Sequence, residues 1–304
     1  MITVKKLVLA IISITLISFV IPTSAQQISI GTPAAQTVEV YIIENGTVHV
    51  THNVEQSNTV NQVTLVNGTM KNLKVIDERG NEPQYANATL GSVLESITLF
   101  PRNSDVTIEY DLDDSGLEKI GETWRWHFYY KGSPILIFPE KVDLVFANEK
   151  PVKIDEMRGF KCHGCGVNIE YVLDEPIQKK IVQWEDREFI VEIRTLEEIS
   201  SFSFDQPRRS IIFDVNEGNQ FVTLIIPLEL LWKPYDVYLN EKNILKHEFY
   251  SNETHAMLNV KPKTTGTLLI IGTSVVPEFP ILIPLFLGLT AVILIQLKNR
   301  TSLR

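Results

Sequence analysis

Residues 37–51 run Thr37-Val-Glu-Val-Tyr-Ile-Ile-Glu44, then Asn45-Gly46, then Thr47-Val-His-Val-Thr51, and this stretch decides the fold class. Apolar and polar residues alternate on both sides of Asn45-Gly46, and a period of two is typical of a strand with one buried face. Asn-Gly between two such segments predicts a β-hairpin with a two-residue type I′ turn. Asn67-Gly68, between segments 60–66 and 69–75, predicts a second hairpin of the same kind.

Short alternating segments recur along the chain, while helical periodicity is almost absent between its two ends. Short strands separated by turns rich in Gly, Pro and Asn predict an all-β chain with two or more Ig-like β-sandwich domains. Helix is expected there only as a turn near residues 228–232. The further predicted strands are 92–99, 105–110, 123–130, 135–138, 142–146, 167–172, 188–194, 210–215, 220–226, 235–239, 256–260 and 267–271.

The N-terminal end has the three parts of a secretory signal peptide. Lys5 and Lys6 precede an apolar run, residues 7–21, and the small residues Thr23-Ser24-Ala25 follow it. We predict cleavage after Ala25, so that residues 1–25 form the signal peptide. The alternative is an uncleaved signal anchor, and the small-residue exit with the polar Gln26-Gln27 counts against it.

The C-terminal end predicts a membrane anchor. Residues 281–297 carry no charge, and Lys298, Arg300 and Arg304 follow them. At 1.5 Å per residue this helix would span roughly 26 Å, slightly less than the ~30 Å hydrocarbon core of a bilayer. Because positive charge clusters only after the apolar segment, we predict one transmembrane helix, a cytoplasmic tail and an extracellular ectodomain. The alternative is a buried helix of a soluble domain.

The sequence between these ends predicts at least two domains. Residues 26–204 form a β-rich region, which can be divided into a sandwich at 28–147 and a β extension at 148–204 with both cysteines. The turn-forming run Asp205-Gln206-Pro207-Arg208-Arg209 marks a boundary. Residues 205–276 are then a membrane-proximal β-sandwich, and residues 277–304 contain the anchor and its tail.

The charge of the ectodomain limits its partners. Without the signal and anchor segments it has 23 basic and 36 acidic residues, a net charge of −13. Phosphate contacts need clustered Lys and Arg, so nucleic acid is excluded as a partner. An acidic ectodomain favours solubility and suits cations or a salty exterior.

Five Asn-x-Ser/Thr sequons occur in the chain. An exported ectodomain could carry glycans on the first four, whereas the fifth would be on the cytoplasmic side and is predicted to be unmodified. The five asparagines are Asn45, Asn67, Asn87, Asn252 and Asn299.

Cys162-His163-Gly164-Cys165 contains the only two cysteines of the chain. In an exported protein the simplest interpretation is a local disulfide. A second is a copper(I) or zinc site, with Cys162, His163 and Cys165 as ligands. A third is a redox-active pair, although the flanking residues lack the helix N-terminus that activates such a motif.

An acidic segment has the spacing of a calcium loop. Asp111, Asp113 and Ser115 stand at positions 1, 3 and 5, Gly116 at position 6, and Glu122 at position 12. The usually apolar eighth position is Glu118, and a strand precedes the loop where a helix is expected. The alternatives are a calcium site and an ordinary solvated acidic turn.

Four aromatic residues alternate along one predicted strand, and they therefore share one face of it. This face either packs into the core or forms a flat platform for sugars or another surface protein. The residues are Trp124, Trp126, Phe128 and Tyr130.

Catalytic motifs are not recognised in this sequence. It has no G-x-S-x-G, no H-E-x-x-H, no phosphate-binding P-loop and no dinucleotide-binding fingerprint. The chain is therefore predicted not to be an enzyme. No cofactor is expected, with calcium, copper or zinc at the sites above as the alternatives.

The string Val275-Val276-Pro277-Glu278-Phe279-Pro280, followed by an apolar segment and a basic tail, resembles the PEF-type C-terminal anchor of archaeal surface proteins. Residues 225–231 and 270–276 are similar to a small β domain that precedes such anchors. The resemblance implies an archaeal cell surface, a membrane-proximal stalk and an anchor segment that can be removed by processing.

Together these features predict an exported cell-surface protein with a binding or structural role in the envelope. The expected partners are the membrane, through the C-terminal helix, and other envelope proteins or glycans. The alternative function is a CxxC-dependent extracellular redox protein or a protein that handles copper or zinc.

Overall fold

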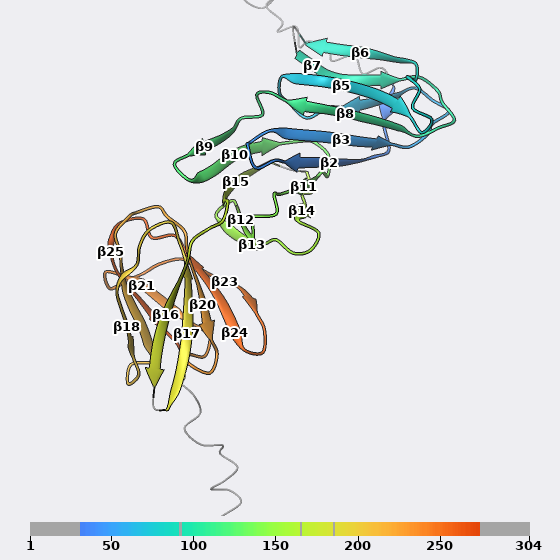
Figure 1. Cartoon of the computed structure of the whole chain (residues 1–304). Coiled ribbons are helices and arrows are strands. Elements are labelled where there is room, and N and C mark those ends of the chain that lie inside the picture. Colours follow the sequence, from blue (N-terminus) through green and yellow to red (C-terminus); the bar gives the residue numbers. More distant parts are fainter. Residues whose placement is uncertain (1–30, 91–92, 165, 185, 274–304) are drawn as a thin grey trace, which may run out of the picture. The chain divides into compact units, whose positions relative to one another are not determined.

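A computed structural model describes residues 31–90, 93–164, 166–184 and 186–273. All regular elements in these ranges are β-strands, as the sequence predicts, and they form five sheets (Figure 1). The chain separates into two compact units: residues 31–36, 54–65 and 75–107 belong to the first, and the other described residues to the second. The predicted signal peptide and anchor lie outside the described residues. In the part of the chain that the structure describes, no helix is long and apolar enough to cross a membrane.

The first unit contains a four-stranded sheet. In spatial order its strands are β1 (Thr32–Pro33), β4 (Asn61–Thr64), β7 (Val93–Leu99) and β6 (Tyr85–Leu90). β1 runs parallel to β4, and the other neighbours are antiparallel. Val63 and Ile97 face each other across β4 and β7 and are fully buried, so these strands share one apolar face.

A six-stranded sheet lies mainly in the second unit. In spatial order its strands are β14 (Gly159–Lys161), β11 (Ile135–Ile137), β2 (Gln36–Ile42), β3 (Val48–Val54), β8 (Val106–Leu112) and β5 (Met70–Asp77). β11 runs parallel to β2 and antiparallel to β14. Alternate residues of β2 and β3 are buried, among them Val40 and Val50, so the period of two in residues 37–51 produces an apolar face.

The hairpin predicted at Asn45-Gly46 joins β2 to β3, but its turn is not type I′. Ile43 N–H donates to the Thr47 carbonyl at 2.9 Å, which leaves three residues in the loop. Of these only Gly46 has a positive φ, 88°. A type I turn followed by a left-handed residue is common in three-residue loops. Glycine is also required for space, because a Cβ here would lie 2.6 Å from the Trp124 ring.

The hairpin predicted at Asn67-Gly68 is wrong. β4 and β5 flank this dipeptide, but they belong to different sheets and do not pair. Turn-forming residues favour a change of chain direction. They do not decide which strands pair, because pairing depends on the faces that each strand must bury.

An antiparallel five-stranded sheet follows in the second unit. In spatial order its strands are β13 (Lys150–Lys153), β12 (Leu144–Ala147), β15 (Gly166–Val172), β10 (Thr123–Tyr129) and β9 (Leu117–Ile120). Its aromatic side chains contact the six-stranded sheet. Tyr171 on β15 stacks on Trp124 at 6.3 Å between ring centroids and meets the edge of Phe138 at 5.5 Å. Phe138 in turn stacks on Phe160 of β14 at 5.8 Å.

The C-terminal part of the second unit is a β-sandwich of two five-stranded sheets. The strands of one sheet are β16 (Ile177–Trp184), β17 (Arg187–Arg194), β20 (Val222–Pro227), β24 (His255–Val260) and β23 (Lys246–Ser251). Those of the other are β18 (Ser200–Asp205), β19 (Ser210–Val215), β25 (Gly266–Ile271), β21 (Asp236–Leu239) and β22 (Lys242–Asn243). Both sheets contribute to one buried cluster that includes Ile193, Phe213, Leu224, Leu258 and Ile270.

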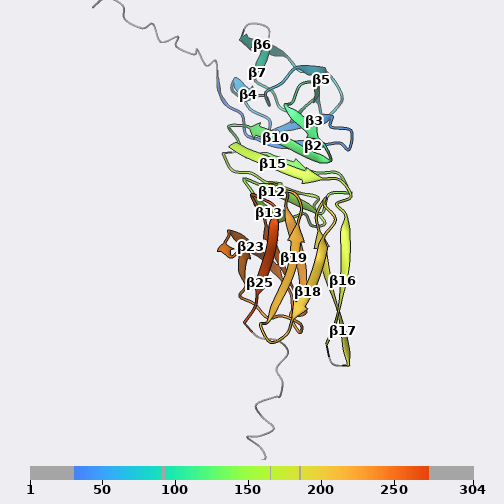
Figure 2. The same ribbon diagram turned by 90° about the vertical axis from the view of Figure 1, so that its left-hand side faces the viewer.

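This sandwich begins before the predicted boundary at residues 205–209. β16 and β17 form a long hairpin (Figure 2), and β17 pairs with β20 through Ile193 and Leu224. The run of turn-forming residues connects β18 to β19 inside the domain. The structure therefore extends the C-terminal sandwich over residues 177–271. The expected helical turn near residues 228–232 is a single turn, in which Leu231 N–H donates to the Pro227 carbonyl at 3.1 Å.

Candidate functional site

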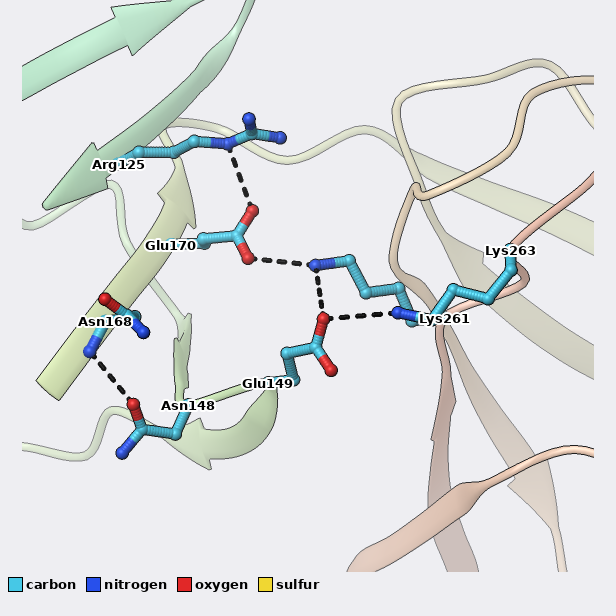
Figure 3. Close-up of polar contacts among 7 residues, drawn as sticks. All are labelled: Arg125, Asn148, Glu149, Asn168, Glu170, Lys261 and Lys263. Atoms are coloured by element: carbon cyan, nitrogen blue, oxygen red, sulfur yellow. Dashed lines mark hydrogen bonds and ion pairs between the residues drawn. The ribbon is translucent and has the colours of Figure 1, made fainter. Parts of the chain in front are cut away.

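An ion-pair network connects the C-terminal sandwich to the sheet that precedes it within the second unit (Figure 3). Lys261, directly after β24, places Nζ 2.9 Å from Glu170 Oε1 and 3.2 Å from Glu149 Oε1. The second Glu170 oxygen lies 3.2 Å from Arg125 Nε. Lys263 approaches Glu149 Oε1 at 3.4 Å. We call these five residues the junction network.

The turn between β12 and β13 presents Glu149 to the network. Asn148 and Glu149 have φ values of 50° and 64°, and two consecutive left-handed residues are the feature of a type I′ turn. Asn148 Oδ1 accepts the Asn168 N–H at 3.0 Å, and Asn148 N–H donates to the Asn168 carbonyl at 2.8 Å. These bonds to β15 fix the turn and hence the position of the Glu149 carboxylate.

An aromatic contact lies beside the junction network. Phe146 of β12 and Phe221 stack with 3.5 Å between centroids and 6° between planes. The Lys261 ammonium lies 4.2 Å from the centre of the Phe221 ring, which is a cation–π distance. With a side chain only 14% exposed, Lys261 is held between carboxylates and an aromatic face. Such shielding makes its ion pairs stronger than those of an ordinary surface lysine.

The pKa values of two carboxylates in this part of the second unit shift in opposite directions. The hydrogen bond and charge of Lys261 lower the pKa of Glu149. Glu175 lies in the segment between β15 and β16, and burial raises its pKa to about 7. The nearby Arg194 opposes this rise and Asp143 adds to it, and these two form an ion pair at 3.1 Å.

The CxxC motif is only partly described. Cys162 follows β14, donates its N–H to the Pro134 carbonyl at 2.9 Å and is not a free thiol. His163 Nδ1 lies 3.3 Å from Ser133 Oγ. Cys165 lies outside the described residues, so the disulfide stays a prediction. Among the residues that the structure describes, no group of three or more His, Cys, Asp and Glu is arranged to hold a metal ion.

The residues of the predicted calcium loop are not gathered around one point. Asp111 lies in β8 and Glu122 lies beyond β9, and the Ser115 carbonyl accepts a hydrogen bond from Trp126 Nε1 at 2.6 Å. Each carboxylate has its own partner, and the calcium site stays a prediction. The contacts are Asp111 with His49 at 2.8 Å and with Asn72 at 2.7 Å, Asp113 with Lys71 at 2.7 Å, and Glu122 with Lys119 at 2.9 Å.

The four aromatic residues of β10 and its end are buried, which corrects the alternative of an exposed platform. Trp126 and Phe128 contact each other at 4.7 Å between centroids, and Trp124 stacks on Tyr171. The opposite face of the strand is exposed, as Tyr129 shows. The inward face of this strand carries large aromatic rings. Removing these rings from water into the core lowers the free energy of the folded state. The exposed fractions are 8% for Trp124, 3% for Trp126, 1% for Phe128 and 4% for Tyr130.

The four sequons within the described residues lie on the surface. Their asparagine side chains belong to exposed residues, so each is open to modification, and Asn299 lies outside the described residues. The exposed asparagines are Asn45, Asn67, Asn87 and Asn252.

No protein-family model matches this chain, and a comparison with curated proteins finds no match. Sequence reasoning did not find the junction network, because Lys261 and Glu170 are 91 residues apart. The one local signal is Asn148, a turn-forming residue that directly follows the apolar segment at residues 144–147.

We predict that Lys261→Met lowers the free energy of unfolding by about 1–3 kcal/mol, the usual cost of removing hydrogen bonds to a partly buried charged group. The matched control is Lys263→Met, because Lys263 contacts the same Glu149 but is 65% exposed, and we expect a change within about 0.5 kcal/mol. Urea unfolding of both variants measures the difference. Equal effects would contradict a special role for Lys261.

We predict that Glu175 makes stability fall as pH rises. Its native pKa of about 7 lies above its ordinary value of 4.5, so the native state binds more protons than the unfolded state between these values. Glu175→Gln should therefore match the wild type near pH 4 and exceed it above pH 7, by up to about 3 kcal/mol. Unfolding measured across this range tests the prediction. Asp174→Asn, whose carboxylate is exposed, should retain the wild-type slope.

Proposed function

We propose that this chain is an exported, membrane-anchored cell-surface protein that has a binding or structural role in an envelope. The observation that carries the proposal is the junction network, which connects the C-terminal sandwich to the preceding sheet of the second unit through the shielded pair of Lys261 and Glu170. A sandwich fixed in this way to the sheet that precedes it supports a stalk-like or scaffolding ectodomain. The exposed sequons add support, because surface asparagines are accessible to glycosylation.

The location in this proposal rests on the sequence. The basic and apolar residues 1–25 support export, and the uncharged residues 281–297 with their basic flank support a single anchor. The likeness of residues 275–280 to PEF-type motifs supports an archaeal surface. In this proposal the sandwich at residues 177–271 is the domain next to the membrane.

We expect protease added to intact cells to remove the ectodomain and to leave a C-terminal epitope tag inside. Lysed cells, in which the tag is also degraded, are the control for accessibility. A matched variant that ends after Thr273 should be released into the medium, because it lacks the proposed anchor. Full protection of the ectodomain in intact cells, or release of the full-length chain, would overturn the proposal.

The proposal includes a disulfide between Cys162 and Cys165. We expect no titratable thiol in the chain unfolded without reductant, and a mass lower than that of the reduced chain by two hydrogen atoms. Replacing both cysteines by Ser should cost little stability, because so short a loop restrains the unfolded chain only slightly. Two thiols that titrate only after chelation, with copper or zinc bound to the purified chain, would instead favour metal handling.

A further inference from the structure

The outward face of the β16–β17–β20–β24–β23 sheet has several exposed apolar side chains. Its cross-strand register places Glu192, Ile225, Met257 and Tyr250 in one row. Ile190 on β17 is 43% exposed and Tyr250 on β23 is 41% exposed. These residues line a groove of about 410 Å³, and Lys153 of β13 closes one side with its ammonium 4.3 Å from the Tyr250 ring centre.

Asn252 lies on the rim of the same groove. It belongs to the turn between β23 and β24, in the sequence Tyr250-Ser251-Asn252-Glu253-Thr254. Its Oδ1 accepts hydrogen bonds from Thr254 N–H at 2.9 Å, from the Thr254 hydroxyl at 3.0 Å and from His255 N–H at 2.6 Å. The carbonyl side of the amide is therefore held by the turn. Nδ2, the atom to which an N-linked glycan is attached, makes no hydrogen bond to the described residues.

We propose that Asn252 carries an N-linked glycan whose first sugar packs against Tyr250 and fills this groove. A pyranose presents C–H groups on its faces and hydroxyls on its rim. Ile190, Met257 and the Tyr250 ring match the C–H groups, while Lys153 and Glu192 can bind hydroxyls. A glycan anchored on the rim enters the groove at high effective concentration, so even a weak contact is occupied.

The occupant is the chain's own glycan because the attachment atom and the groove share one short turn. Asn87 provides the comparison, since it also follows a tyrosine by two residues, Tyr85. It lies inside strand β6, where it pairs with Ile97, rather than in a turn. The inference rests on the proposed export, because N-linked glycans are added outside the cytosol.

The test uses the full chain with a single sequon retained, either Asn252 or Asn87, and Gln at the other ectodomain sequons. Each version is purified from an archaeal host that glycosylates and from a bacterial host that does not. Glycopeptide mass spectrometry should find a glycan on Asn252. Glycosylation should raise the melting temperature of the Asn252 version by about 2–4 °C, the shift that one additional aromatic contact gives in a chain of this size.

The role of the ring is tested by Tyr250→Ala, which should abolish this glycan-dependent shift, and by Tyr250→Phe, which should retain it. Tyr85→Ala in the Asn87 version is the matched control and should not change the effect of its glycan. Asn252 without a glycan, or a shift that survives Tyr250→Ala, overturns the inference. A glycan found on Asn87 in its version but none on Asn252 would overturn the inference and leave the proposed export intact, whereas a fully protected and unglycosylated ectodomain would overturn both.

Discussion

The Lys261 ammonium is the constraint on which the second unit depends. The C-terminal sandwich has its own buried core, so nothing in that core requires contact with the preceding sheet. The contact is made by a small apolar cluster of Leu144, Phe146 and Phe221, with Lys261 beside it. Burying a lysine costs free energy unless its charge is paired. Glu170 and Glu149 provide this pairing. A lysine that would destabilise the fold without partners therefore fixes how the sandwich contacts the preceding sheet.

The local part of the fold could be predicted from the sequence, because it depends on patterns within a few residues. The alternation in residues 37–51 predicts β2 and β3 correctly, and that of residues 123–130 predicts β10 and the shared face of its four aromatic residues, while the burial of that face is known only from the structure. Turn types were less predictable. Asn148-Glu149 and Asn240-Glu241 adopt two consecutive positive φ values without glycine. Asn45-Gly46 and Asn67-Gly68 contain the expected glycine, yet one forms a longer loop and the other joins strands that do not pair.

The non-local part could not be predicted, since strand pairing is decided by burial in three dimensions. β16 has exposed Ile177 and Ile181 on the face away from the core, so its sequence does not reveal that it joins the C-terminal sandwich. The junction network has the same origin. Lys261 and Glu170 are ordinary charged residues in the sequence. They form an ion pair only because the fold brings β15 near the end of β24. The groove beside Asn252 likewise needs residues from β13, β17, β20 and β23 together.

The opposite pKa shifts of Glu149 and Glu175 follow from the surroundings of each carboxylate: a lysine partner for Glu149 and desolvation for Glu175. Glu149 stands at a turn and receives a lysine hydrogen bond, so its ionised form is favoured and its contribution to stability is lost as pH falls through its lowered pKa. Glu175 is half-buried and desolvated, with Arg194 opposing the effect only in part, so its protonated form is favoured and stability is lost as pH rises towards 7. Between these limits Glu149 is charged and Glu175 is neutral. In mild acid each carboxylate is therefore in the form that its surroundings favour, and neither one opposes the native state.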